Sequence, residues 1–377
     1  MGMRTRDYFP LGIATGNAFC NRTDDIKLLV DNIKNGKHTL LIATRRYGKS
    51  SLALKAIHLA KLPHTEADFY MASHEKAIEA YILNSTVELI GRALGPLEKL
   101  VSSIKKYIKN LTPKINIGTN HFNLELQSDT TIDPASNVKE ALLLLENLLA
   151  EKGKQAVFLM DEFQNVGMIA QGKGIEAAIR HVAQKTKYLT IIFSGSNRHL
   201  LQTMFEDENR PLYKLCWKMT LSRIAAAHYE RYIQTVAKTT WKKLLPEDVF
   251  SAIMILSARH PYYVNKLCDR IWTFFEKMPT LNDVETAWLD VLQEEKSDAV
   301  KEISLLSSGQ KNVLLHIAKH TSPQLTSKES LMAMEMTGSS VMTALHGLEE
   351  KDIIERHENN YQIVNPVVKY YALKGAT

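Results

Sequence analysis

The sequence predicts an α/β fold with a parallel sheet, followed by a helical region and a small C-terminal domain. Three observations lead to this architecture. Apolar runs at 38–42, 156–160 and 189–193 are short and continuous, as in strands covered on both faces. After a short strand expected at 220–224, the chain up to residue 302 carries apolar side chains at helical spacing. Residues 303–377 combine three short helical segments with two strand-like segments, an order of elements typical of a winged helix.

The first apolar run leads into a glycine-containing loop and then a helix. Backbone N–H groups of such a loop, with the helix N-terminus, converge on phosphate oxygens. Gly48 allows close backbone approach, Lys49 reaches the β and γ oxygens, and the Ser50 hydroxyl is a Mg²⁺ ligand. The alternative is a chance match in an ordinary strand-to-helix turn. The residues expected to contact the nucleotide here are Ala43, Thr44, Arg45, Arg46, Tyr47, Gly48, Lys49, Ser50 and Ser51.

One position of this loop departs from the usual pattern. Ala43 stands where a glycine normally opens a phosphate-binding loop. Alanine fits there only if its φ stays negative or the strain is small.

The second apolar run ends in two adjacent acids. Buried carboxylates are costly unless something balances their charge. Mg²⁺ would balance Asp161, and Glu162 is expected to act as the general base for a water molecule. The alternative is an exposed strand end with two solvated acids.

The third apolar run ends in small polar residues. Ser194 and Ser196 are candidates to hydrogen-bond the attacking water or the γ-phosphate, and Arg198 is a candidate charge sensor. The alternative is a simple Ser-Gly turn.

Five segments, in this order and at these separations, carry a family resemblance. They are Phe19-Cys20-Asn21-Arg22, RRYGKSSL from residue 45, DEFQNV from residue 161, FSGSNRHL from residue 193, and Arg259-His260-Pro261-Tyr262-Tyr263. The chain resembles the archaeal-type P-loop ATPases of the STAND branch of the AAA+ superfamily (MNS-like clade). The resemblance extends from about residue 9 to residue 373.

The resemblance implies ATP and Mg²⁺ as cofactors, an ATPase core, a helical lid and a C-terminal winged helix. It assigns Phe19 and Arg22 to nucleotide binding, and His260 and Pro261 to the lid motif. His260 has an equal alternative role in packing. Arg259 replaces the glycine of that motif. Arg210 lies where relatives place an arginine finger, although an ordinary surface arginine is an equal alternative.

Three domains are expected. They are an ATPase core at 1–220 with a helix-and-hairpin insertion near 95–135, a helical lid at 221–302, and a winged helix at 303–377. In the insertion, residues 114–118 and 120–126 alternate with period two about a glycine, which indicates a hairpin.

Composition limits the class of protein. The chain has 377 residues, 45% of them hydrophobic and 23% charged, as in ordinary globular proteins. It has no apolar stretch of some 20 residues and no signal peptide pattern, so we expect a cytoplasmic protein without a membrane partner. Three distant cysteines, Cys20, Cys216 and Cys268, favour buried free thiols.

The expected macromolecular partners are another copy of the chain or a different protein. Duplex DNA is the alternative, because the formal net charge is +6. Residues 305–377 contain six Lys and one Arg against six Glu and one Asp, so the winged helix is neutral. A neutral winged helix matches DNA poorly. The basic strip of the insertion, either a phosphate-backbone contact or a solvated helix face, comprises Lys99, Lys105, Lys106, Lys109 and Lys114.

Three functions remain open on the sequence. The first is an ATP-hydrolysing switch whose nucleotide state controls lid closure, self-association and partner engagement. The second is a DNA-binding AAA+ protein, resembling initiators or transposition regulators, that uses the winged helix. The third is a scaffold that holds nucleotide without hydrolysis.

Overall fold

The computed structural model describes residues 7–117, 122–129, 131–169, 172–320, 324–357 and 360–375. The chain forms two compact units. The core unit comprises Thr23–Arg45 and Lys49–Leu221, and the helical unit comprises the segment up to Arg22, the three residues Arg46–Gly48, and the chain from Ser222 onward. The tip of the glycine-containing loop therefore belongs to the helical unit.

The core unit contains a five-stranded parallel sheet in the order β2-β5-β6-β1-β7. Because β1 lies between β6 and β7, and β5 between β2 and β6, the three sequence-predicted strands are all central or next to the centre. The strands are β1 Thr39–Ala43, β2 His64–Asp68, β5 Ala156–Asp161, β6 Leu189–Gly195 and β7 Trp217–Leu221.

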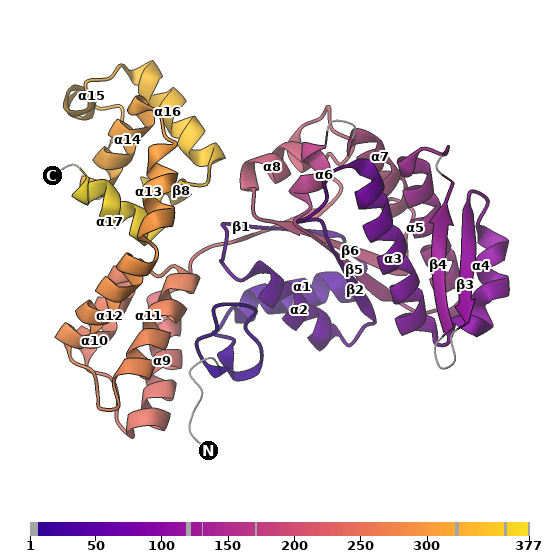
Figure 1. Cartoon of the computed structure of the whole chain (residues 1–377), viewed down its shortest axis with the longest axis horizontal. Coiled ribbons are helices and arrows are strands. Elements are labelled where there is room, and N and C mark those ends of the chain that lie inside the picture. The colour runs from indigo at the N-terminus through magenta and orange to yellow at the C-terminus, as the bar shows by residue number, and fades with distance from the viewer. Residues whose placement is uncertain are drawn as a thin grey trace. The chain divides into compact units, whose positions relative to one another are not determined.

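The central strands are covered on both faces, as their continuous apolar sequences predict. Every residue of β1, β5 and β6 is buried. Helices α1 and α2 lie on one side of the sheet, and α3, α5 and α7 lie on the other (Figure 1). Leu40 and Ile42 of β1 pack with the second group of helices. These helices are α1 Thr23–Lys34, α2 Lys49–Ala60, α3 Glu75–Leu94, α5 Pro134–Lys152 and α7 Gly172–Ala183.

The insertion contains the expected hairpin. Strands β3 Leu111–Ile117 and β4 Phe122–Ser128 pair antiparallel. The residues that join them lie outside the described ranges. Before the hairpin, residues 75–107 form α3, a 3₁₀ turn at Leu97–Leu100 and the short helix α4 Val101–Tyr107. Gly95, with φ 95°, ends α3 because this conformation suits glycine alone.

Two short helices complete the core unit around the carboxyl ends of the strands. Helix α6 Gln164–Met168 follows β5, and α8 Arg198–Glu206 follows β6. The Asn197 side chain caps α8 by accepting from the Leu200 N–H.

The core unit ends with β7 at Leu221, and the helical unit resumes at Ser222. The segment expected as a strand at 220–224 is thus β7, three residues earlier. The helical unit contains a two-stranded antiparallel wing. The elements are α9 Ala226–Trp241, α10 Glu247–Leu256, α11 Pro261–Phe274, α12 Leu281–Glu294, α13 Lys296–Ser304, α14 Ser308–Lys319, α15 Lys328–Met334, α16 Gly338–Glu350, β8 Ile354–His357, β9 Asn360–Ile363 and α17 Pro366–Lys374.

One apolar core joins the helices of this unit, from α9 to α17. Capping boxes start α12, at Thr280 with Asp283, and α14, at Ser307 with Gln310. Among the described residues, no helix combines the length and the apolar character needed to cross a bilayer. Cys268 is buried, Cys20 and Cys216 are half-buried, and all three are free thiols.

Candidate nucleotide site

The first part of the site lies in the core unit, where β1 and β5 end. Asp161 is the last residue of β5 and is buried. The Ser50 hydroxyl donates to its Oδ2 at 2.8 Å, and the Ser194 hydroxyl donates to its Oδ1. The carboxyl ends of neighbouring parallel strands lie at one edge of the sheet. Ser50, 111 positions before Asp161 in the sequence, and Ser194, 33 positions after it, therefore both reach its carboxylate. Ser50 and Asp161, the two expected Mg²⁺ ligands, are thus adjacent, and Ser194 contacts the same carboxylate.

The loop after β1 has the backbone that phosphate binding requires. Gly48 has φ 84°, in the left-handed region that glycine adopts without strain. Lys49 opens helix α2, so the N–H groups of its first turn follow the loop directly. Ala43 ends β1 with a negative φ, which removes the concern raised by the missing glycine.

Two side chains donate hydrogen bonds to the Glu162 carboxylate. The Ser196 hydroxyl donates to its Oε2 at 2.8 Å, and the Gln164 amide donates to the same oxygen. Glu162 has φ 49°, an uncommon conformation for a residue with a Cβ. Such outliers often lie at functional sites, where the surroundings enforce them.

Two further acids lie beside Asp161 and were not found from the sequence. Glu66 and Asp68 lie on β2, and Asp68 is directly opposite Asp161 in the sheet. Burial, followed by the charge of Asp161, raises the pKa of Glu66. Burial raises the pKa of Asp68, and the Asp161 and Glu162 carboxylates add to the effect. Only the pairing of β2 with β5 brings these acids together.

The donor set fits Mg²⁺. This ion prefers carboxylate and other oxygen ligands, and it usually keeps several waters and phosphate oxygens in its shell. Ser50 and Asp161 offer such oxygens at hydrogen-bond distance from each other, and additional carboxylates on β2 make this edge of the sheet strongly acidic.

The residues of the loop tip belong to the helical unit, where they make a separate set of contacts. Tyr47 is 1% exposed. Its hydroxyl donates to Glu355 Oε1 at 2.8 Å, and the Arg223 Nε donates to the same carboxylate oxygen at 2.9 Å. The Arg22 guanidinium donates to the Tyr47 carbonyl at 3.0 Å. A residue of the phosphate-loop motif is thereby bonded to the wing strand β8.

The lid motif packs on the same residues. The His260 ring lies edge-on to Tyr47 with centroids 4.8 Å apart, and the Arg46 guanidinium lies 4.0 Å from the Tyr262 ring centroid. His260 is 3% exposed, and its Nδ1 has no hydrogen-bond partner within the described part of the chain. Burial, together with Arg223, lowers the pKa of His260 to about 3. His260 is therefore neutral at pH 7, and both its proposed roles remain compatible with its position.

Arg259 occupies the place of the family's glycine with φ 55°. Its N–H donates to the Met254 carbonyl at 3.1 Å, which closes helix α10. The left-handed conformation explains why a glycine suits this position. Pro261 is the first residue of α11, where its fixed φ and missing N–H fit.

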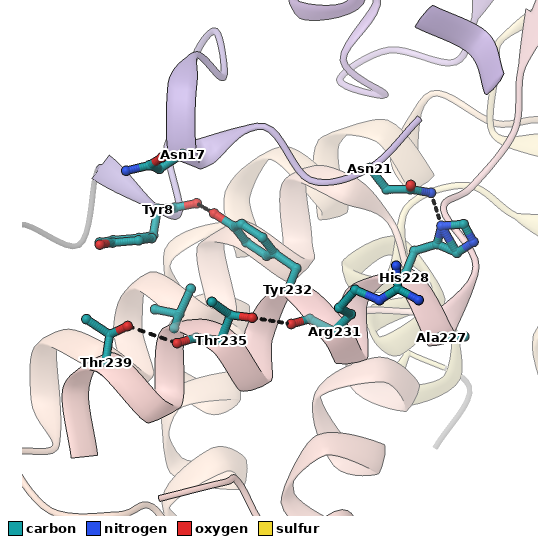
Figure 2. A pocket seen from close by; sticks show the side chains of 10 residues that line it. Tyr8, Asn17, Asn21, Ala227, His228, Arg231, Tyr232, Thr235 and Thr239 are labelled. Carbon is teal, nitrogen blue, oxygen red and sulfur yellow. Dashed lines mark hydrogen bonds between the residues drawn. The ribbon is translucent and has the colours of Figure 1, made fainter. Parts of the chain in front are cut away.

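A pocket of about 570 Å³ lies in the helical unit between the N-terminal segment and α9. Figure 2 shows Tyr8, Asn17 and Asn21 on the N-terminal segment, with the Asn21 side chain directed at His228 of α9. The Tyr232 hydroxyl donates to the Tyr8 carbonyl, and this bond ties the segment to the helix. The pocket has the size of a small-molecule site. Asn21 lines it and is followed by Arg22, the residue that contacts the loop tip.

The two candidate arginines of the core unit differ in their surroundings. Arg210 donates to Glu176, a fully buried acid of α7, and its side chain is 14% exposed. The guanidinium is therefore bound within its own unit, and a role as arginine finger remains a prediction. Arg198 is the first residue of α8, directly after the sensor segment. Phe19 is half-buried in the N-terminal segment.

The comparisons with known proteins bear on the fold. A family model described as a probable winged helix domain matches residues 300–374. No curated protein matches the sequence. Among solved structures, the Walker-type ATPase PABY2304 of Pyrococcus abyssi is 19% identical, with a TM-score of 0.66, and the match covers 94% of this chain and 96% of that one.

A second solved structure is the ORC2 protein of Aeropyrum pernix in its ADPNP–ADP complexes. It is 11% identical, with a TM-score of 0.56, and the match covers 94% of each chain. At these identities the likeness establishes the fold: an α/β core with a parallel sheet, followed by helices and a winged helix.

Proposed function

We propose that this protein is an ATP-hydrolysing molecular switch. The observation that carries the proposal is the Ser50–Asp161 hydrogen bond, which places a loop hydroxyl against the acid at the end of β5. The neighbouring Glu162 is oriented by two donors. A Walker-type ATPase with the same fold supports the assignment. The finer assignment to the archaeal-type STAND group rests on the sequence segments alone.

Each residue has a defined task in this proposal. Gly48, Lys49 and the first turn of α2 bind the phosphates, while Ser50 and Asp161 hold Mg²⁺. When bound, Mg²⁺ neutralises phosphate charge as it develops. Phe19 and Arg22 contact the bound nucleotide, as the family resemblance implies.

The hydrolytic step needs a base and a charge sensor. Glu162 accepts a proton from water, and the water oxygen bonds to the γ-phosphorus. The bond between that phosphorus and its bridging oxygen breaks, and ADP leaves with the electron pair. Ser194 and Ser196 hydrogen-bond the reacting groups, and Arg198 stabilises charge on the γ-phosphate.

The switch would operate through the loop tip. Tyr47 lies within the phosphate-loop motif, yet its hydroxyl is bonded to Glu355 of the winged helix. A change in the loop on ATP binding or hydrolysis would alter this bond, and with it the lid and the wing. Self-association or binding of a partner protein would follow from the new surface.

The test is steady-state phosphate release and ATP binding for three proteins. We expect turnover for the wild type, loss of ATP binding for Lys49→Ala, and ATP binding without turnover for Glu162→Gln. Equal turnover by wild type and Glu162→Gln would contradict the assignment of the base. ATP binding by the wild type without turnover would favour the scaffold alternative, and no ATP binding would overturn the proposal.

DNA engagement is the second candidate function. The observation that favours it is the exposure of all five lysines of the basic strip, Lys99, Lys105, Lys106, Lys109 and Lys114. Lys106, however, forms an ion pair with Glu151 at 2.8 Å, which lowers its availability for phosphate. Duplex DNA added to the same assay distinguishes the two functions. Stimulation that falls with salt and is lost on Lys105→Glu/Lys106→Glu would support the DNA candidate.

A further inference from the structure

Resting on the proposed hydrolysis by Glu162, we propose that Gln164 is a positioning residue that holds this carboxylate in its reactive orientation, and that Gly195 is the residue that makes room for it. Gln164 is 6% exposed and opens helix α6, two residues after Glu162. It comes from the segment after β5, whereas Gly195 ends β6. The two residues link two motifs that the sequence presents as separate.

The hydrogen bonds define which oxygen of Glu162 is held. Gln164 Nε2 and Ser196 Oγ both donate to Oε2. Within the described part of the chain, Oε1 has no hydrogen-bond partner. A carboxylate fixed at one oxygen presents the other in a defined direction. Gln164 and Ser196 together therefore leave Oε1 as the oxygen that accepts the proton of water.

The orientation of the Gln164 amide is unfavourable for its own oxygen atom. Its Oε1 is buried and has no hydrogen-bond partner among the described residues. An unsatisfied buried acceptor is unfavourable. Rotating the amide by 180° would place Oε1 against the Glu162 carboxylate, which is worse because two acceptors would face each other. The observed orientation indicates that donation to Glu162, and not packing alone, determines how this side chain lies.

Gly195 is needed for this arrangement. A Cβ at position 195 would collide with Oε1 of Gln164, well inside van der Waals contact, and would also approach the side chain of Leu201. The φ of Gly195 is not positive, so conformational freedom does not explain the glycine. The close approach of the Gln164 side chain explains why this position is a glycine.

The effect on turnover should be separable from effects on folding and ATP binding. Gln164→Met keeps a side chain of similar length and apolar packing but removes the amide donor. We expect kcat to fall about tenfold or more for Gln164→Met, because the carboxylate loses its fixed direction. ATP affinity and the midpoint of urea unfolding should stay close to wild type. A residue with a packing role alone would retain kcat in this variant.

A double-mutant cycle tests the link to Gly195. Gly195→Ala in the wild type should lower kcat, because the new methyl group displaces the Gln164 amide. In the Gln164→Ala background, the same substitution should add little further loss, since the Gln164 amide is gone and only the Leu201 side chain remains close. Additive losses in the cycle, or unchanged kcat in Gln164→Met, would overturn the inference.

The proposed function and this inference can fail independently. If the wild type binds no ATP or releases no phosphate, the ATPase proposal fails, and the role of Gln164 falls with it. If the wild type turns over ATP and the Gln164 and Gly195 variants behave independently, only the positioning role is wrong.

Discussion

At the scale of single residues, the site contains carboxylates that are unfavourable to bury, and neighbouring groups hydrogen-bond them. Asp161 ends a fully buried strand, and two hydroxyls together with the Glu162 N–H hydrogen-bond its carboxylate. The next residue, Glu162, has its own backbone in the left-handed region. A folded chain retains such features only where the surrounding structure enforces them. This supports a chemical role for the end of β5.

His260 provides a pH-dependent prediction. Burial and Arg223 lower its pKa from 6.5 to about 3, so the folded protein keeps it neutral while the unfolded chain protonates below 6.5. The free energy of unfolding should therefore fall as the pH drops below 6.5, by about 1.4 kcal/mol per pH unit. Above pH 6.5 this contribution should be constant.

The measurement compares urea unfolding of the wild type and His260→Gln at pH 7 and pH 5. The wild type should lose about 2 kcal/mol more than the variant between these values. His346→Gln is the matched control, because His346 has a side chain 63% exposed. Parallel losses in wild type and His260→Gln would show that His260 is not buried in its neutral form.

At the scale of elements, the wing strand β8 carries a buried acidic residue, Glu355. Glu355 is 8% exposed, and its Oε1 accepts from Tyr47, Arg223 and the Gln362 amide. Arg223 also donates to the Ala258 carbonyl and to the carbonyls of Ile363 and Val364. The loop tip, the end of α10 and the wing thus share one buried ion pair.

Removing the acid should be strongly destabilising. Glu355→Ala leaves the Arg223 charge buried without its partner, and we expect a loss of about 3–5 kcal/mol in the free energy of unfolding. Glu355→Gln keeps the shape and should cost less. Glu329→Ala, at an exposed position of α15, should change stability by less than about 0.5 kcal/mol. Chemical denaturation checks these values, and a loss below about 1 kcal/mol for Glu355→Ala would show that the pair is solvated.

At the scale of the whole molecule, the phosphate-loop motif is divided between two units. Arg46–Gly48 belong to the helical unit, and the residues on either side belong to the core unit. The proposed switch requires that a ligand bound at this motif change the contacts of Tyr47 within the helical unit.

The switch predicts a difference between nucleotide states. ATP-loaded Glu162→Gln should sediment as a larger species than the ADP-loaded protein, while Lys49→Ala should be indifferent to nucleotide. ATP at about one hundred times its Kd should also add about 2.7 kcal/mol to the free energy of unfolding, because only the folded chain binds it. Analytical ultracentrifugation checks the first point. Identical sedimentation with ATP and ADP would contradict nucleotide-controlled self-association.

The sequence by itself determined the central strands, the hairpin, the helices that follow the core and the wing, because each follows from local periodicity and turn residues. It also determined the pairing of the phosphate loop with the acidic strand end, since parallel strands present their carboxyl ends at one edge. The expected strand at 220–224 was misplaced by three residues, because the apolar pattern there is short and edge strands are weakly patterned.

Only the tertiary structure decided which distant side chains meet. Glu66 and Asp68 approach Asp161 through the pairing of β2 with β5, and nothing in their local sequence marks them. Gln164 reaches Glu162 because Gly195, on another strand, leaves space for it. Glu355 meets Tyr47 across 308 positions of sequence. Local patterns specify elements because their periodicity is short, whereas contacts between elements depend on packing that no single segment encodes.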